Sequence, residues 1–150
     1  IFGCQWAYET FGICPMLHPA DEHRYLHAGE ELQLFLHQRV EIPVPSLAAY
    51  LVDGQKLSFG NHDFEVIATP GHTPGGVCFY CATEKVLITG DSLFEGSIGR
   101  CDLPEGDMET LIQSLQTRVM TLPDDVRIYP GHGRSSTIGR ERTSNPYLIP

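Results

Sequence analysis

The length, composition and charge of the chain limit the classes of protein to which it can belong. A chain of 150 residues, of which 41% are hydrophobic, can bury the core of one domain, so we predict a single domain over residues 1–150. Its 10 basic and 19 acidic residues give a formal net charge of −9 without any basic patch, which argues against nucleic acid as a partner. No apolar run reaches the roughly 20 residues that span a bilayer, and the first residues lack the pattern of a signal peptide. We therefore expect a cytoplasmic protein without membrane contacts.

The first third of the chain is predicted to be mainly helical. Three elements are expected there: a helix over residues 2–11 that ends at Gly12, a short strand over 13–17, and a helical region over 20–38 that breaks near Gly29. Pro43 and Pro45 then exclude a regular helix over residues 40–47, which we expect to be extended.

From Lys56 onward, strand-forming segments replace the helical pattern. Two hairpins are predicted, the first from strands 56–59 and 64–69 and the second from strands 76–82 and 86–89. They are followed by a helix with five apolar residues on one face (Met108, Leu111, Ile112, Leu115 and Val119), a strand over 126–129 and a short helix within 135–142. Strands grouped in the middle with helices at both ends predict an α+β fold, in which helices cover a sheet.

The cysteines do not indicate a disulfide framework. There are five, an odd number in a chain of ordinary size, so free thiols are expected. Cys78 and Cys81 form a C-x-x-C, which could be half of a zinc knuckle or a redox pair. Their segment has the pattern of a strand, in which positions i and i+3 point to opposite faces. We therefore predict that the two sulfur atoms diverge and that this motif has no chemistry of its own.

Three of the predicted strands end in glycine followed by a residue that can bind a metal ion. These residues are His72, Asp91 and His132. Glycine permits the sharp or left-handed backbone that turns a side chain off the end of a strand. If the strands lie side by side, two imidazoles and a carboxylate meet at one edge of the sheet. This is a ligand set for zinc or a similar transition metal.

The remaining histidines give weaker signals. A single Gly-His pair is more often a turn with a hydrogen-bonded histidine, but three strand-Gly-ligand units in one domain favour a metal site. His23 and His27 stand at i, i+4 spacing on a predicted helix, which can also bind zinc, but no third ligand is evident. His18, His37 and His62 are interpreted as surface or turn residues.

Three longer motifs resemble those of a known family. The segments are TPGHTPGGVCFY, LITGDSLFEGSIGRCDLPEGD and IYPGHGRSSTIGRERTSNPYL. They are similar to the later motifs of the metallo-β-lactamase fold superfamily, and most of all to its glyoxalase II-like branch, the hydroxyacylglutathione hydrolases. The resemblance implies that His72 binds one metal ion, that Asp91 bridges two ions as the central catalytic ligand, and that His132 binds the second. It also implies zinc, two ions per complete site, with iron or manganese as alternatives, and Arg100 near the glutathione carboxylate.

The family motif H-x-H-x-D-H, which supplies further ligands to both metal ions, does not occur in this sequence. In the family it lies just before a helix of the type predicted here over residues 2–11. The chain therefore resembles the C-terminal two thirds of such a hydrolase, with a partial αββα sandwich that lacks its N-terminal strands. Three ligand side chains suffice for weak binding of a single zinc with an open position, but not for a dinuclear site. We expect little or no activity from this chain alone.

The resemblance implies a hydrolytic function, beside which two alternative functions stay open. It implies hydrolysis of a small thioester of the hydroxyacylglutathione type, in which two metal ions activate water and polarise the carbonyl under attack. β-Lactam hydrolysis is less favoured because those enzymes commonly have a Cys where Asp91 stands. A metal-dependent hydrolase of unknown substrate and a non-catalytic metal-binding or interaction module are the alternatives. Absent strands would also leave an exposed sheet edge, which favours a homo-oligomer.

Overall fold

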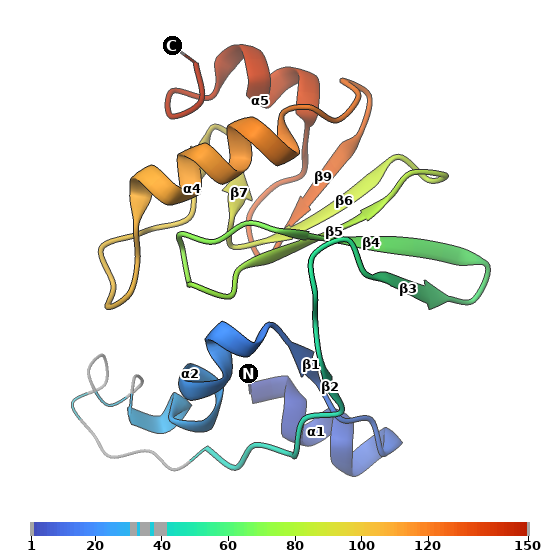
Figure 1. Ribbon diagram of the computed structural model, residues 1–150, viewed down its shortest axis with the longest axis vertical. Coiled ribbons are helices and arrows are strands. Elements are labelled where there is room, and N and C mark those ends of the chain that lie inside the picture. The colour runs from blue at the N-terminus through green and yellow to red at the C-terminus, as the bar shows by residue number, and fades with distance from the viewer. Residues whose placement is uncertain (1, 31–32, 34–36, 38–41, 150) are drawn as a thin grey trace. The chain divides into compact units, whose positions relative to one another are not determined.

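The computed structural model describes residues 2–30, 33, 37 and 42–149. The chain divides into two compact units, which we call the N-terminal unit (residues 1–51) and the C-terminal unit (residues 52–150). Helices and sheets occur in both, so the predicted α+β class is confirmed (Figure 1). The prediction of a single domain stays a prediction. Within the described ranges, no helix is long and apolar enough to cross a membrane.

The N-terminal unit is mainly helical, as predicted. Its elements are α1 (Phe2–Phe11), β1 (Met16–Leu17), a 3₁₀ turn (Pro19–Asp21), α2 (Glu22–Leu26) and β2 (Ala49–Tyr50). Helix α1 ends at Gly12, whose φ of +67° is left-handed and whose N–H donates to the Tyr8 carbonyl at 2.8 Å. The predicted strand over 13–17 is present only as its last two residues. Part of the predicted helical region 20–38 lies outside the described residues.

A buried tyrosine holds the extended segment of this unit. The Tyr25 hydroxyl, in α2, donates to the Pro45 carbonyl at 2.7 Å. Residues 42–47 form no helix, as Pro43 and Pro45 predict, and residues 40–41 lie outside the described part. The segment then leads into β2, which pairs in parallel with β1.

The C-terminal unit is built on a six-stranded sheet (Figure 1). Its strands are β3 (Lys56–Phe59), β4 (His62–Ala68), β5 (Val77–Cys81), β6 (Val86–Gly90), β9 (Arg127–Pro130) and β10 (Ser136–Thr137). The order across the sheet is β10-β9-β6-β5-β4-β3. Both predicted hairpins are confirmed, since β3 pairs with β4 and β5 with β6, each antiparallel. A separate small hairpin, β7 (Leu93–Phe94) with β8 (Ser97–Ile98), follows β6.

The strand directions bring the predicted metal ligands to one end of this sheet. β5 lies between β4 and β6 and is antiparallel to both, so β4 and β6 run the same way. β9 is parallel to β6. The carboxyl ends of β4, β6 and β9 therefore share one end of the sheet, and His72, Asp91 and His132 follow these three strands.

Helices α4 (Met108–Ser114), which continues as a π-helical turn (Leu115–Val119), and α5 (Ile138–Ser144) cover one face of the sheet (Figure 1). The core between them is apolar and includes Ile67, Cys78, Leu87 and Ile128 from the sheet and Leu111, Leu115, Val119 and Ile138 from the helical side. The helical periodicity after Asp107 is thus confirmed at its buried positions. Met108 is the exception, because its side chain is 52% exposed at the first residue of the helix.

Candidate metal centre

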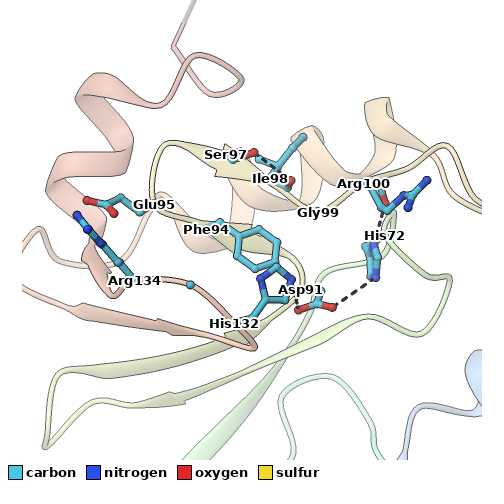
Figure 2. Close-up of a pocket in the computed structure, with 11 residues that line it drawn as sticks. His72, Asp91, Phe94, Glu95, Ser97, Ile98, Gly99, Arg100, His132 and Arg134 are labelled. Carbon is cyan, nitrogen blue, oxygen red and sulfur yellow. Dashed lines mark hydrogen bonds and ion pairs between the residues drawn. The ribbon is translucent and has the colours of Figure 1, made fainter.

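The structure brings the three predicted ligands together at the carboxyl ends of β4, β6 and β9. His72, Asp91 and His132 all line one cavity of about 450 Å³. Figure 2 shows the Asp91 carboxylate between the two imidazole rings. One carboxylate oxygen, Oδ2, is 4.0 Å from Nε2 of His72, and the other, Oδ1, is 3.7 Å from Nε2 of His132. The two histidines thus face different oxygens of the same carboxylate.

The hydrogen bond of His72 fixes which of its nitrogens can bind a metal ion. Nδ1 of His72 lies 2.7 Å from the carbonyl oxygen of Arg100, which can only accept a hydrogen bond. The proton of the neutral ring must therefore reside on Nδ1. Nε2 is left with a free lone pair on the side that faces Asp91, and this is the tautomer that metal-binding histidines use.

Glycine precedes each of the three ligands for a physical reason, and the reasons differ. Gly71 (φ +137°) and Gly90 (φ +49°) have the positive φ angles expected at sharp strand ends. Gly71 also packs closely, since a Cβ there would lie 2.4 Å from the Leu111 backbone nitrogen. At Gly131 the reason is space alone, because a Cβ would lie 2.5 Å from Oδ1 of Asp91. The absence of a side chain at Gly131 therefore lets the Asp91 carboxylate pack directly against the backbone.

The two histidines differ in their surroundings. The His72 side chain is 21% exposed, whereas that of His132 is 74% exposed. The ring of Phe94, at the end of β7, packs on the His132 ring with centroids 4.5 Å apart and an interplanar angle of 31°. His132 is thus oriented by an aromatic contact, and His72 by a hydrogen bond to the backbone.

The geometry fits two metal half-sites that share Asp91. Ligand atoms 2.0–2.1 Å from a tetrahedral zinc ion lie roughly 3.3 Å from one another. The 3.7 and 4.0 Å separations are a few tenths of an ångström longer and exceed hydrogen-bond length. Among the described residues, no three His, Cys, Asp or Glu side chains are placed to hold one ion together. The arrangement therefore offers the pairs His72–Asp91 and His132–Asp91 rather than a single three-ligand site.

Arg100, predicted to bind substrate, lines the same cavity but is already engaged. Its guanidinium donates two hydrogen bonds to the Asp102 carboxylate, at 2.8 and 2.9 Å. This bidentate pair lowers the pKa of Asp102 and raises the pKa of Arg100. The observed contribution of Arg100 to the site is its backbone carbonyl, which holds His72.

Several cavity residues were missed by the sequence reasoning. Phe94 and Glu95 come from the β7–β8 hairpin, and Arg134 follows His132 by two residues. The hairpin strands are two residues long, too short for a periodic pattern. For Arg134 a signal existed, since a charged residue so near a strand-end ligand must lie near the same site.

The prediction of free cysteines is confirmed, whereas the predictions that the other histidines bind no metal and that the C-x-x-C has no chemistry of its own stay predictions. The rings of His23 and His27 stack, with centroids 4.2 Å apart, and neither joins a group of three metal-binding side chains in the described ranges. All five cysteines are free. Cys78 belongs to the core beneath α4 and α5, whereas Cys81 is buried outside that cluster.

Comparison with known proteins identifies the family. Residues 1–132 match the model of the metallo-beta-lactamase superfamily. The chain is 46% identical over 149 residues to hydroxyacylglutathione hydrolase GloC of Haemophilus influenzae (strain ATCC 51907 / DSM 11121 / KW20 / Rd), an alignment that covers 81% of this chain and 70% of that protein. Alignments with four further curated relatives, two of which are named as metallo-hydrolases, cover 40% to 65% of their lengths.

Solved structures agree with this assignment. The fold matches the crystal structure of TTHA1623 in a di-iron-bound form with a TM-score of 0.87 and 35% identity, over 99% of this chain and 71% of that one. It matches BLEG-1 B3 metallo-beta-lactamase with a TM-score of 0.87 and 34% identity, over 97% and 69% of the two chains. These similarities support a metal-dependent hydrolase whose metal is not specified by the comparison. The chain belongs to the metallo-beta-lactamase superfamily.

Proposed function

We propose that this chain provides one side of a two-metal site that hydrolyses a small thioester of the hydroxyacylglutathione type. The observation on which the proposal rests is that the two oxygens of Asp91 face the Nε2 atoms of two different histidines. A carboxylate in this position can bridge two ions. The identity of 46% to a hydroxyacylglutathione hydrolase supports the choice of substrate class.

In this proposal each described ligand has a defined task. His72 would hold one ion through Nε2, His132 the other, and Asp91 would bind both, with zinc as the expected metal and iron or manganese as alternatives. Bound metal ions would supply a Lewis acid that activates water and polarises the scissile carbonyl near neutral pH. The hydrogen bond from His72 Nδ1 to the Arg100 carbonyl keeps Nε2 free for this task. Gly131 leaves room for Asp91 to face both histidines.

A second candidate is a metal-binding module without catalysis. It is favoured by the absence, within the described residues, of any three side chains that could hold one ion. Two ligands per half-site give weak binding, so this candidate predicts no more than one loosely held metal ion per chain.

The deciding experiment measures metal content and thioester hydrolysis together. We expect the chain alone, supplied with zinc, iron or manganese, to hydrolyse S-lactoylglutathione very slowly or not at all. A longer chain with an H-x-H-x-D-H segment joined before Ile1 should bind two metal ions and hydrolyse the thioester, and Asp91→Asn in that longer chain should abolish hydrolysis. Equal metal-dependent rates for the two chains would contradict the prediction for the chain alone. A longer chain that binds two ions but cleaves no thioester would contradict the proposed function.

A further inference from the structure

We propose that Arg134, rather than Arg100, binds the anionic end of the substrate. The inference rests on the proposed thioesterase function and specifies where the non-reacting part of the substrate is held. It follows from which charged side chains of the cavity already form ion pairs with other residues.

Two arginines line the cavity, and only one of them is available. The Arg100 guanidinium donates two hydrogen bonds to the Asp102 carboxylate, from Nε at 2.8 Å and from Nη2 at 2.9 Å. This bidentate pair occupies donors that would otherwise bind a substrate carboxylate. Arg134 has no hydrogen bond or ion pair with any residue in the described ranges. Its side chain is exposed and lines the cavity, so its positive charge is accessible to an anion bound there.

The acidic residue on the same side of the cavity as Arg134 forms its ion pair with another arginine. In Figure 2, Glu95 and Arg134 lie on the same side of the cavity. The Glu95 carboxylate, however, pairs with Arg140, with 2.6 Å between Oε1 and Nη1. The remaining carboxylate of the cavity is Asp91, whose oxygens face His72 and His132. Once these pairs are formed, Arg134 is the uncompensated charge of the described cavity lining.

The position of Arg134 also sets the direction of a bound substrate. Figure 2 shows His72 and Arg100 at one end of the cavity and Arg134 at the other, with Asp91 between them. Arg134 lies two residues after His132 in the loop between β9 and β10, in which Gly133 has a left-handed φ of +83°, and both side chains line the cavity. A substrate whose reacting carbonyl lies at Asp91 would therefore extend its anionic group past His132.

Guanidinium groups bind planar anionic oxygens, and two kinds of thiol carrier offer them. Glutathione-type thioesters have carboxylates, and coenzyme A-type thioesters have phosphates. Both would place an anion against Arg134. An exposed, charge-assisted contact of this kind is expected to change affinity by about tenfold.

The experiment measures binding to the full 150-residue chain without metal, so that it does not depend on hydrolysis. S-methylglutathione, its dimethyl ester and adenosine 3′,5′-bisphosphate are titrated into the protein at low salt, with chemical-shift changes by NMR as the readout. The variants are Arg134→Gln and Arg100→Gln. Lys56→Gln, in the edge strand β3, is the matched control for loss of one exposed positive charge.

We expect Arg134→Gln to weaken binding of S-methylglutathione about tenfold and to leave binding of the ester unchanged, with Arg100→Gln and Lys56→Gln close to wild type. A selective effect on the bisphosphate instead would also support the site and would assign it to coenzyme A-type thioesters. The proposal is overturned if neither anion binds to the wild-type chain, if Arg134→Gln binds both anions as wild type does, or if Arg100→Gln has the larger effect. None of these results bears on whether a metal-loaded longer chain cleaves thioesters.

Discussion

The Cys78 thiol is fully buried in a small polar cluster directly behind two of the ligand loops. Its Sγ lies 3.5 Å from Oγ1 of Thr69, and Oγ1 of Thr69 lies 2.9 Å from Oγ of Ser92. Thr69 ends the strand before His72, and Ser92 follows Asp91. This hydroxyl pair joins the two strand ends, and the thiol packs beneath it. The cluster therefore connects Cys78 of the core with the strand ends that precede His72 and carry Asp91.

Burial raises the pKa of the Cys78 thiol from 9.0 to about 11, although hydrogen bonds from Thr69 and Ser92 partly oppose the shift. Because the thiolate is disfavoured only in the folded state, the unfolded chain loses its proton first as the pH rises. We predict that the free energy of unfolding falls by about 2 kcal/mol between pH 9 and pH 11 relative to Cys78→Ala. Urea unfolding of both proteins across this range measures the difference. Parallel pH profiles would contradict the prediction.

At the residue scale, the sequence predicted which candidate ligands meet at one end of the sheet, but not the groups that orient them. His72, Asp91 and His132 were predictable because each follows Gly at a strand end, and strand and Gly patterns are local. The contact of Phe94 with His132 and the Arg100–Asp102 pair depend on where the β7–β8 hairpin and its following loop settle. These contacts depend on the tertiary structure, which a local sequence pattern does not contain. The assignment of substrate binding to Arg100 therefore rested on the resemblance of its motif alone.

Among the elements, α5 holds the hairpin that forms one wall of the cavity. Glu141 of α5 is fully buried and accepts hydrogen bonds from the Gly96 N–H (2.8 Å), from Asn145 Nδ2 (2.8 Å) and from the Ser136 hydroxyl. Asn145 Nδ2 also lies 3.1 Å from the Ser97 carbonyl. Gly96 and Ser97 lie at the turn of β7–β8. The C-terminal helix therefore fixes the hairpin that presents Phe94 to His132.

We predict that Glu141→Ala destabilises the protein by about 3 kcal/mol, because the Gly96 N–H and the buried side chains of Ser136 and Asn145 lose the carboxylate to which they donate. Glu109→Ala, at an exposed position of α4, is the control and should change stability by less than about 0.5 kcal/mol. Urea unfolding measures both. NMR contacts between the Phe94 and His132 rings should weaken in the first variant only. Similar stabilities for the two variants would refute this role of Glu141.

Element types were easier to predict than element bounds. The two hairpins and the helix after Asp107 were predictable because apolar periodicity is long enough there to distinguish helix from strand. Strand β1 is shorter than predicted, since only Met16 and Leu17 find a partner, in β2. Met108 has the right spacing for the core, but at the first residue of α4 it remains 52% exposed. The pairing of a strand and the burial of a side chain depend on segments far away in the sequence, so a local sequence pattern does not predict them.

At the scale of the whole molecule, the expected homo-oligomer remains a proposal, and the structure suggests where to test it. β3 is an end strand of the six-stranded sheet, and its Phe59 side chain is 79% exposed. Unpaired strand edges with exposed apolar residues invite pairing with a second copy. On the sheet itself, the central Ile88 is also exposed, at 42%.

We predict that the chain forms dimers at micromolar to millimolar concentration and that Phe59→Lys, which places a charge at the edge, shifts it to monomer. Ile88→Lys is the comparison that separates edge pairing from face packing and should leave the dimer intact. Sedimentation velocity over a concentration series measures both. A monomer at every concentration, or loss of the dimer only in Ile88→Lys, would rule out association through β3.

The strand order of the sheet also predicts an order of assembly for the candidate metal centre. β3, β4, β5 and β6 are consecutive antiparallel neighbours, whereas β9 joins β6 in parallel from a distant part of the chain. Local pairings form readily, and a distant parallel pairing must first overcome the entropy of closing a long loop. We therefore expect His72 and Asp91 to meet before His132, which follows β9. A folding intermediate without the β6–β9 pairing would hold only the His72–Asp91 half of the candidate metal centre.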